Sequence, residues 1–105
     1  MANTVKRLFR GAATTTVTTT LYTVPAVTNT VVTNIAITNT ASSAGTFTLS
    51  MGPAAGPFAL HTTTNIAANT TIYIDLKQHL ATTEVITGGA SATSINFHIS
   101  GVEIA

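Results

Sequence analysis

The sequence predicts an all-β protein, an antiparallel β-sandwich of about eight strands, on three observations. Apolar residues recur at every second position in several segments, which is typical of strands with one buried face. Threonine, which is β-branched and suits a pleated surface, accounts for 24 of the 105 residues. Clusters of Gly, Pro, Asn and Ser separate the segments as turn signals. Strand number alone leaves two topologies open, Ig-like and jelly-roll.

The N-terminal segment 1–11 carries three of the four cations of the chain. We expect it to form a first strand or an arm that docks on a neighbouring molecule, ahead of a β-sandwich domain over residues 12–105. A strict period of two divides the segment into two faces, with Val5, Arg7 and Phe9 on one and Lys6, Leu8 and Arg10 on the other.

The next predicted strands are a threonine-rich segment, VTTTLYTV at 17–24, and a longer one, TNTVVTNIAITNT at 28–40. In the longer strand, apolar residues occupy both faces: Val31, Ile35 and Ile37 on one, Val32 and Ala36 on the other. Apolar residues on both faces indicate a central strand, or one covered by a partner.

Three further segments alternate cleanly: 45–51, 70–76 and 94–101. Their predicted inward residues are Phe47, Leu49, Met51, Ile72, Ile74, Leu76, Ile95, Phe97 and Ile99. After Gly101 the apolar residues change parity, to Val102 and Ile104. A bulge or bend at Gly101 would keep these two inward as well.

Weaker strands are predicted at FALHT, 58–62, and TTEVIT, 82–87. The clearest turn signals between strands are GPAAGP at 52–57 and GGASA at 88–92. Helical structure is expected at most as a single turn within residues 75–83.

Composition excludes several classes of function. Only 7% of residues are charged and the net charge is +1, so the chain lacks the basic patch that nucleic-acid or anionic-membrane binding requires. Cysteine is absent, and no apolar run approaches the length of a membrane-spanning helix. The N-terminus lacks the apolar core of a secretory signal, so we expect synthesis in a cytoplasm.

We also expect no enzymatic activity, no cofactor and no metal. The carboxylates available for acid–base chemistry are Asp75, Glu84 and Glu103. The histidines are His61, His79 and His98, and none has a partner at the spacing of a metal site. No nucleophile-elbow, P-loop or dinucleotide-binding motif is present.

The order of segments resembles small β-sandwich structural proteins of tailed bacteriophages. The N-terminal LFRG comes first in this order. The matching residues after it are Leu21 to Ala26 (LYTVPA), Asn39 with Thr40, and Ser100 to Ile104 (SGVEI). One departure is Val27 and Thr28, where the family pattern has a glycine in the turn after Pro-Ala.

The resemblance implies a non-enzymatic virion protein, foremost a capsid decoration (cement) protein on the capsid surface. Its implied partners are the major capsid protein and copies of itself, with a trimer favoured and neither nucleic acid nor membrane involved. It implies synthesis in the cytoplasm of a bacterial host. A neck, collar, tail or fibre module is the nearest alternative. A host-glycan-binding module that stacks sugars on Tyr22 and Tyr73 is a further alternative.

The expected partner contacts lie in two places, the N-terminal segment and the loop Gly52 to Phe58. The residues concerned are Val5, Lys6, Arg7, Leu8, Phe9, Arg10, Pro53, Ala54, Ala55, Pro57 and Phe58. Nearly neutral, threonine-rich strands remain hydrated yet can still pack against another protein, which suits a subunit that assembles through shape.

Overall fold

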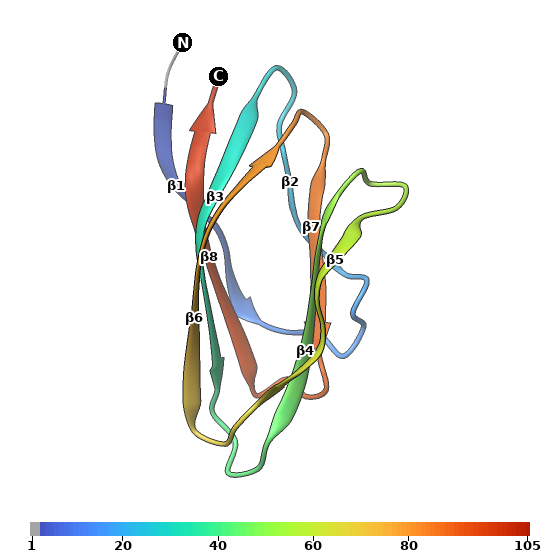
Figure 1. Ribbon diagram of the computed structural model, residues 1–105, viewed down its shortest axis with the longest axis vertical. Coiled ribbons are helices and arrows are strands. Elements are labelled where there is room, and N and C mark those ends of the chain that lie inside the picture. Colours follow the sequence, from blue (N-terminus) through green and yellow to red (C-terminus); the bar gives the residue numbers. More distant parts are fainter. Residues whose placement is uncertain (1–2) are drawn as a thin grey trace.

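The computed structural model describes residues 3–105, and these form eight strands in two antiparallel sheets (Figure 1). The predicted β-sandwich is therefore confirmed. The strands are β1 (Asn3–Ala12), β2 (Thr20–Thr23), β3 (Asn29–Asn39), β4 (Gly45–Gly52), β5 (Phe58–Ile66), β6 (Thr70–Leu80), β7 (Val85–Ala90) and β8 (Ile95–Ile104). Sheet A has the order β1-β8-β3-β6, and sheet B has the order β2-β7-β4-β5.

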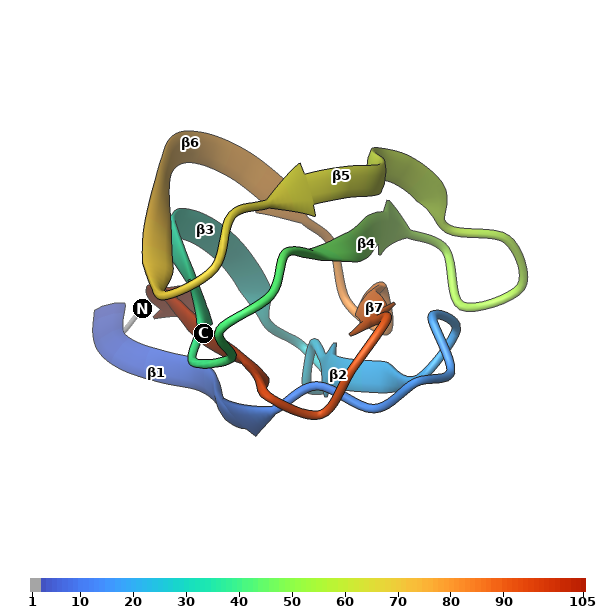
Figure 2. The ribbon, with the colours of Figure 1, turned by 90° about the horizontal axis from the view of Figure 1, so that it is seen from below.

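Consecutive strands almost always lie in opposite sheets. Only β4 and β5, among the strands of residues 3–105, are consecutive neighbours within one sheet. This connectivity favours the jelly roll over the Ig-like alternative, because an Ig sheet keeps consecutive strands together as hairpins. The view in Figure 2 shows the consequence: β1 and β2 border one flank of the sandwich, and β5 and β6 border the other.

The core fills the space between the two sheets and follows the predicted alternation in β4 and β8. All six inward residues predicted for these two strands are buried: Phe47, Leu49, Met51, Ile95, Phe97 and Ile99. Phe47 and Phe97 meet edge to face across the core, with ring centroids 6.4 Å apart. The predicted inward residues of β6, namely Ile72, Ile74 and Leu76, pack against this core from its border.

Two bulges overturn the face assignments made for the N-terminal segment and for the long strand. In β1 the register with β8 shifts between Arg7 and Phe9, so Leu8 and Phe9 both turn toward the core and Arg10 joins the outer face. In β3 the register shifts between Val32 and Asn34. The residues that share the inner face of β3 are consequently Val32, Ile35 and Ile37, whereas Val31 and Ala36 lie outside.

The predicted bulge at Gly101 is wrong, because β8 runs through this position without interruption and its partners bulge instead. Gly101 is buried, and a Cβ atom there would collide with the carbonyl oxygen of Val31. With unbroken alternation, Glu103 takes the next inward position. Val102 and Ile104 therefore lie half-buried on the outer face.

Three other local predictions also need correction. Residues 75–80 continue strand β6, and no helical turn forms there. The glycines of GGASA lie within strand β7 and not in a turn. They are needed there because a Cβ atom at Gly88 or Gly89 would come within 2.7 Å of a backbone oxygen. Only Thr20–Thr23 of the threonine-rich segment is a strand, and the residues just before it cross over β7.

Candidate interaction surfaces

The N-terminal segment forms the edge strand β1, and its residues divide between surface and core. Val5 is 85% exposed, and Arg7 and Arg10 are exposed beside it on the outer face of sheet A. Leu8 is buried, and Phe9 packs partly against the core. Leu8 and Phe9, two of the six residues expected to contact a partner in this segment, therefore pack mainly against the core of the chain itself. Residues 1 and 2 lie outside the described part.

A basic strip lies where β1 meets β8 on that outer face. Arg10 is registered with His98, and Arg7 with Ser100. Because residues opposite one another in antiparallel strands have neighbouring side chains, the two guanidinium groups lie beside a histidine and a hydroxyl group. This strip can accept an acidic group of a partner.

The loop 52–58 is exposed at residues 53–56 and at Phe58, and it borders a hollow of about 360 Å³ on the outer face of sheet B. The hollow has a hydroxyl-lined floor and largely apolar walls from two loops. Its lining residues are Val17, Thr18, Thr20, Thr48, Ser50, Ala54, Ala55, Pro57 and Thr87. Phe58, at the end of the same loop, is 75% exposed and is the largest apolar side chain at this edge. Three of the five residues expected from this loop thus line one concave surface.

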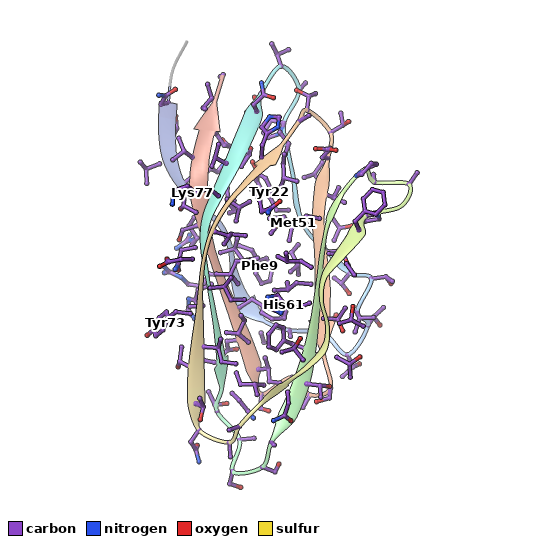
Figure 3. The ribbon with its side chains drawn as sticks, in the orientation of Figure 1. Phe9, Tyr22, Met51, His61, Tyr73 and Lys77 are labelled. Carbon is purple, nitrogen blue, oxygen red and sulfur yellow. The ribbon has the colours of Figure 1, made fainter. Side chains whose placement is uncertain are left out.

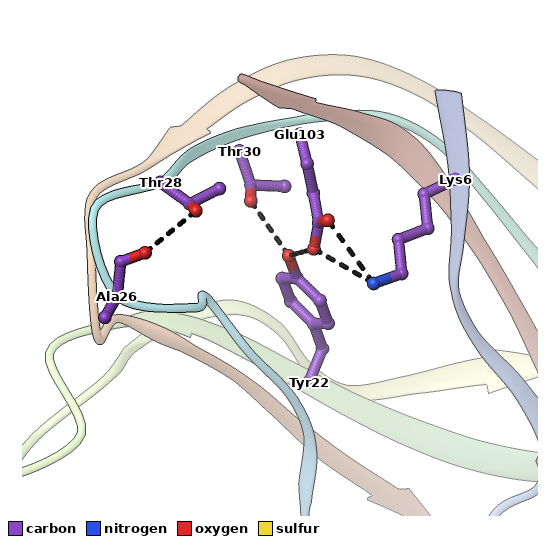
Figure 4. Close-up of polar contacts among 6 residues, drawn as sticks. All are labelled: Lys6, Tyr22, Ala26, Thr28, Thr30 and Glu103. Carbon is purple, nitrogen blue, oxygen red and sulfur yellow. Dashed lines mark hydrogen bonds and ion pairs between the residues drawn. The ribbon is translucent and has the colours of Figure 1, made fainter. Parts of the chain in front are cut away.

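A hydrogen-bonded cluster joins the two sheets near the chain termini (Figure 4). The Tyr22 hydroxyl group donates to Glu103 Oε2 at 2.5 Å and lies 2.9 Å from Thr30 Oγ1. Lys6 Nζ lies 3.3 Å from both carboxylate oxygens of Glu103. Burial, reinforced by the hydrogen bond to Glu103, raises the pKa of Tyr22 from 10.0 to about 12. The phenol therefore remains a hydrogen-bond donor at neutral pH.

The two tyrosines do not form a common stacking platform. Tyr22 is only 9% exposed and points between the sheets, whereas Tyr73 is 73% exposed on the outer face of β6 (Figure 3). His61 also points inward, where its ring lies 5.5 Å from that of Phe47.

The three carboxylate side chains lie in different parts of the structure and make different contacts. Glu103 belongs to the hydrogen-bonded cluster, and Glu84 accepts a hydrogen bond from the Ala81 amide in the β6–β7 turn. Asp75 lies on the exposed face of β6, 3.5 Å from the side-chain amide of Asn34. Across residues 3–105, no three His, Asp or Glu side chains gather where they could hold a metal ion. The same stretch contains no helix that is long and apolar enough to cross a membrane.

Two features escaped the sequence analysis. The wall of the hollow around Val17 depends on a loop that was predicted as strand, and only the two glycines of β7 hinted that another segment passes close by. The hydrogen-bonded cluster was missed because a bulge at Gly101 would have turned Glu103 outward. An acidic residue in an otherwise apolar strand end was the signal available.

Comparison with protein-family models and with curated proteins finds no match for this sequence. Among solved structures, the chain is similar to one of infectious bursal disease virus, Gx strain, with a TM-score of 0.53 and 13% identity over 97% of this chain and 31% of that one. The chain is also similar to one in the T13 particle of the same virus, with a TM-score of 0.55 and 11% sequence identity over 96% of this chain and 30% of that one.

A pentameric capsid protein isolated from metagenomic phage sequences gives a TM-score of 0.38 with 8% identity, over 96% of this chain and 58% of that one. A score this low does not establish a common fold. The chain spans less than a third of the length of the two virus chains described first. At such low identity, the likeness to those two chains shows a shared fold and nothing more.

Proposed function

We propose that this chain is a non-enzymatic structural protein of a virion. Its foremost role is capsid decoration, in which it binds the major capsid protein and copies of itself and so stabilises the shell. The observation that carries the proposal is a sandwich fold shared with chains of a virus particle, combined with a surface that presents apolar side chains and almost no charge. A surface of that kind suits assembly through area and shape.

The exposed residues of the two expected contact regions are the proposed contact sites. Val5, Arg7 and Arg10 present a mixed apolar and basic face on β1. Phe58 stands beside the hollow and has the size and exposure of an interface anchor. Trimers on the shell are the favoured arrangement. Many weak contacts on a repeated lattice then add up through avidity.

Particles that lack the chain provide the test. Purified chain would be added to them, the bound copies counted, and the temperature of shell disruption measured. We expect saturable binding in numbers comparable to the shell subunit, with a more heat-resistant shell. A few copies at a single vertex would instead identify a neck, collar, tail or fibre module. No binding to any part of the particle would refute the structural role.

A matched pair of variants locates the contact. Phe58→Asp should abolish binding to the shell, because a charge replaces the largest exposed apolar side chain of the loop region. Thr62→Asp introduces the same charge at an exposed position of the same strand and should bind normally. Equal binding by both variants would remove Phe58 from the interface.

A further inference from the structure

The two sheets leave four strand edges unpaired within residues 3–105, on β1, β2, β5 and β6. Unpaired edges present free backbone N–H and C=O groups, which a strand of another chain can pair with. When the second chain is a copy of the first and the pairing is antiparallel, a twofold axis relates the two strands. Each residue then lies opposite a fixed partner in the same strand, so the sequence of an edge decides whether it is compatible with itself.

Three of the four edges are unsuited to pairing with themselves. The β1 edge carries Lys6, Arg7 and Arg10, so two copies would oppose like charges. The β2 edge has only four residues. The β5 edge is broken by two register shifts, and Thr63 within it adopts a positive φ of 48°.

The β6 edge is long and balanced in charge, and the one register shift in its pairing with β3 lies between Asp75 and Gln78. Its 11 residues alternate between the core and the exposed face as far as Lys77, after which Gln78 and His79 are both exposed. Every second residue from Tyr73 onward is exposed, which gives Tyr73, Asp75, Lys77 and His79. Read from either end, these four positions run aromatic, charged, charged, aromatic, with opposite charges at the two middle positions. Sheet A therefore ends in a strand whose exposed face is complementary to its own reverse.

We propose that β6 pairs with β6 of a second copy of this chain, antiparallel and centred on Leu76. In that register Asp75 of each copy lies opposite Lys77 of the other, and Tyr73 lies opposite His79. Directly opposed residues of an antiparallel pair have Cβ atoms about 4.5–5.5 Å apart, close enough for two ion pairs and two aromatic contacts. The pairing uses nearly the whole strand and joins the two A sheets into one.

The charges on β6 have no competing ion pair in the described chain. The single ion pair among residues 3–105 joins Lys6 to Glu103, at the opposite edge of sheet A. Asp75 contacts only the neutral amide of Asn34, at 3.5 Å. Tyr73, at 73% exposure, leaves its ring free for a partner.

This inference deepens the self-association included in the proposed function, because it names the strand and the register. A twofold contact through β6 leaves loop 52–58 and the outer face of β1 free to bind the shell or to form a threefold contact. Self-pairing and particle binding can therefore fail separately.

Charge exchange on the full chain tests the pairing. Sedimentation equilibrium would measure the dissociation constant of the dimer for the wild-type chain, Asp75→Lys, Lys77→Asp and the double variant. Each single reversal turns both symmetry-related ion pairs into repulsions, and we expect about tenfold weaker dimerisation or more. The double variant restores opposite charges across the axis and should return to within about threefold of the wild type.

Thr93→Lys is the matched control, because it adds a charge at an exposed position of the β7–β8 turn, outside the proposed contact sites, and should leave dimerisation unchanged. Melting temperatures within a few degrees of wild type establish that each variant is folded. A wild-type chain that stays monomeric at all concentrations would overturn the proposal, and so would a double variant as weak as the single ones. Particle binding by the single variants separates this failure from failure of the proposed function.

Discussion

The two ends of the sandwich are closed by different physical means. The end reached by residues 95–97 of β8 is closed mainly by apolar packing around Phe47 and Phe97, which are almost completely buried. The one buried polar side chain beside them, Asn39, is hydrogen-bonded to backbone groups of Ser43 and Ala41. The other end, near both chain termini in Figure 1, is closed by the hydrogen-bonded cluster of Tyr22, Thr30, Glu103 and Lys6. We refer to these regions as the apolar end and the polar end.

Strand β8 contributes to both ends, and its side chains alternate between core and surface without interruption. Its inward positions carry Ile95 and Phe97 at the apolar end and Glu103 at the polar end. Every buried side-chain nitrogen and oxygen atom within residues 3–105 has a hydrogen-bond partner. The difference teaches that a small sandwich can close one end with hydrogen bonds, provided that each polar group there is satisfied.

The apolar end should show the largest effect of a single substitution. Phe97→Ala removes a fully buried ring and its edge-to-face contact with Phe47, and we expect a loss of about 3–5 kcal/mol in the free energy of unfolding. Urea denaturation measures this loss. A loss below about 1 kcal/mol would mean that the apolar end does not hold the sandwich together.

The polar end should respond less. Tyr22→Phe keeps the ring but removes the hydroxyl group shared by Glu103 and Thr30, which should cost about 1–3 kcal/mol. Tyr73→Phe, at an exposed position, should stay within about 0.5 kcal/mol of the wild type. Equal effects of the two substitutions would show that the cluster adds nothing to stability.

The pH dependence of the free energy of unfolding tests the hydrogen-bonded cluster at the polar end by itself. Because the pKa of Tyr22 is raised from 10.0 to about 12, the folded chain holds this proton more tightly than the unfolded chain. The resulting stabilisation is complete below pH 10 and is lost as the pH rises from 10.0 to about 12. In denaturation curves across that window, the wild type should lose more stability than Tyr22→Phe. Parallel loss in both would contradict the raised pKa.

The smallest effect is expected in the turn at the polar end, and it is a gain. Val27 adopts a φ of 56° and is 88% exposed, so its β-branched side chain is strained without being packed. This is the turn in which the phage-protein pattern has a glycine. Val27→Gly should raise the free energy of unfolding by up to about 1 kcal/mol, because relief of strain exceeds the added chain entropy. Thermal denaturation measures the gain, and Ala26→Gly, which has no positive φ to relieve, should lose stability.

The sequence predicted the hydrophobic core and the exposed loop better than it predicted the shape of the candidate interaction surfaces. Alternation in β4 and β8 identified the buried residues, since a period of two is a local property of an extended chain. Exposure of Pro53 to Phe58 also followed from local turn chemistry. The hollow beside that loop did not, because its second wall comes from residues 17–18, which cross β7 at a place that pairing alone determines.

The sequence by itself determined the fold class, the even spacing of core residues and the near absence of charge, because each is fixed by composition or by a repeat along the chain. The tertiary structure decided where the alternation breaks. The bulge at Leu8 lies opposite Ser100 and Ile99, and the bulge at Thr33 lies opposite Gly101 and Ser100, so both depend on which strands lie together. That same pairing turned Glu103 inward and created the polar end, which no local pattern could specify.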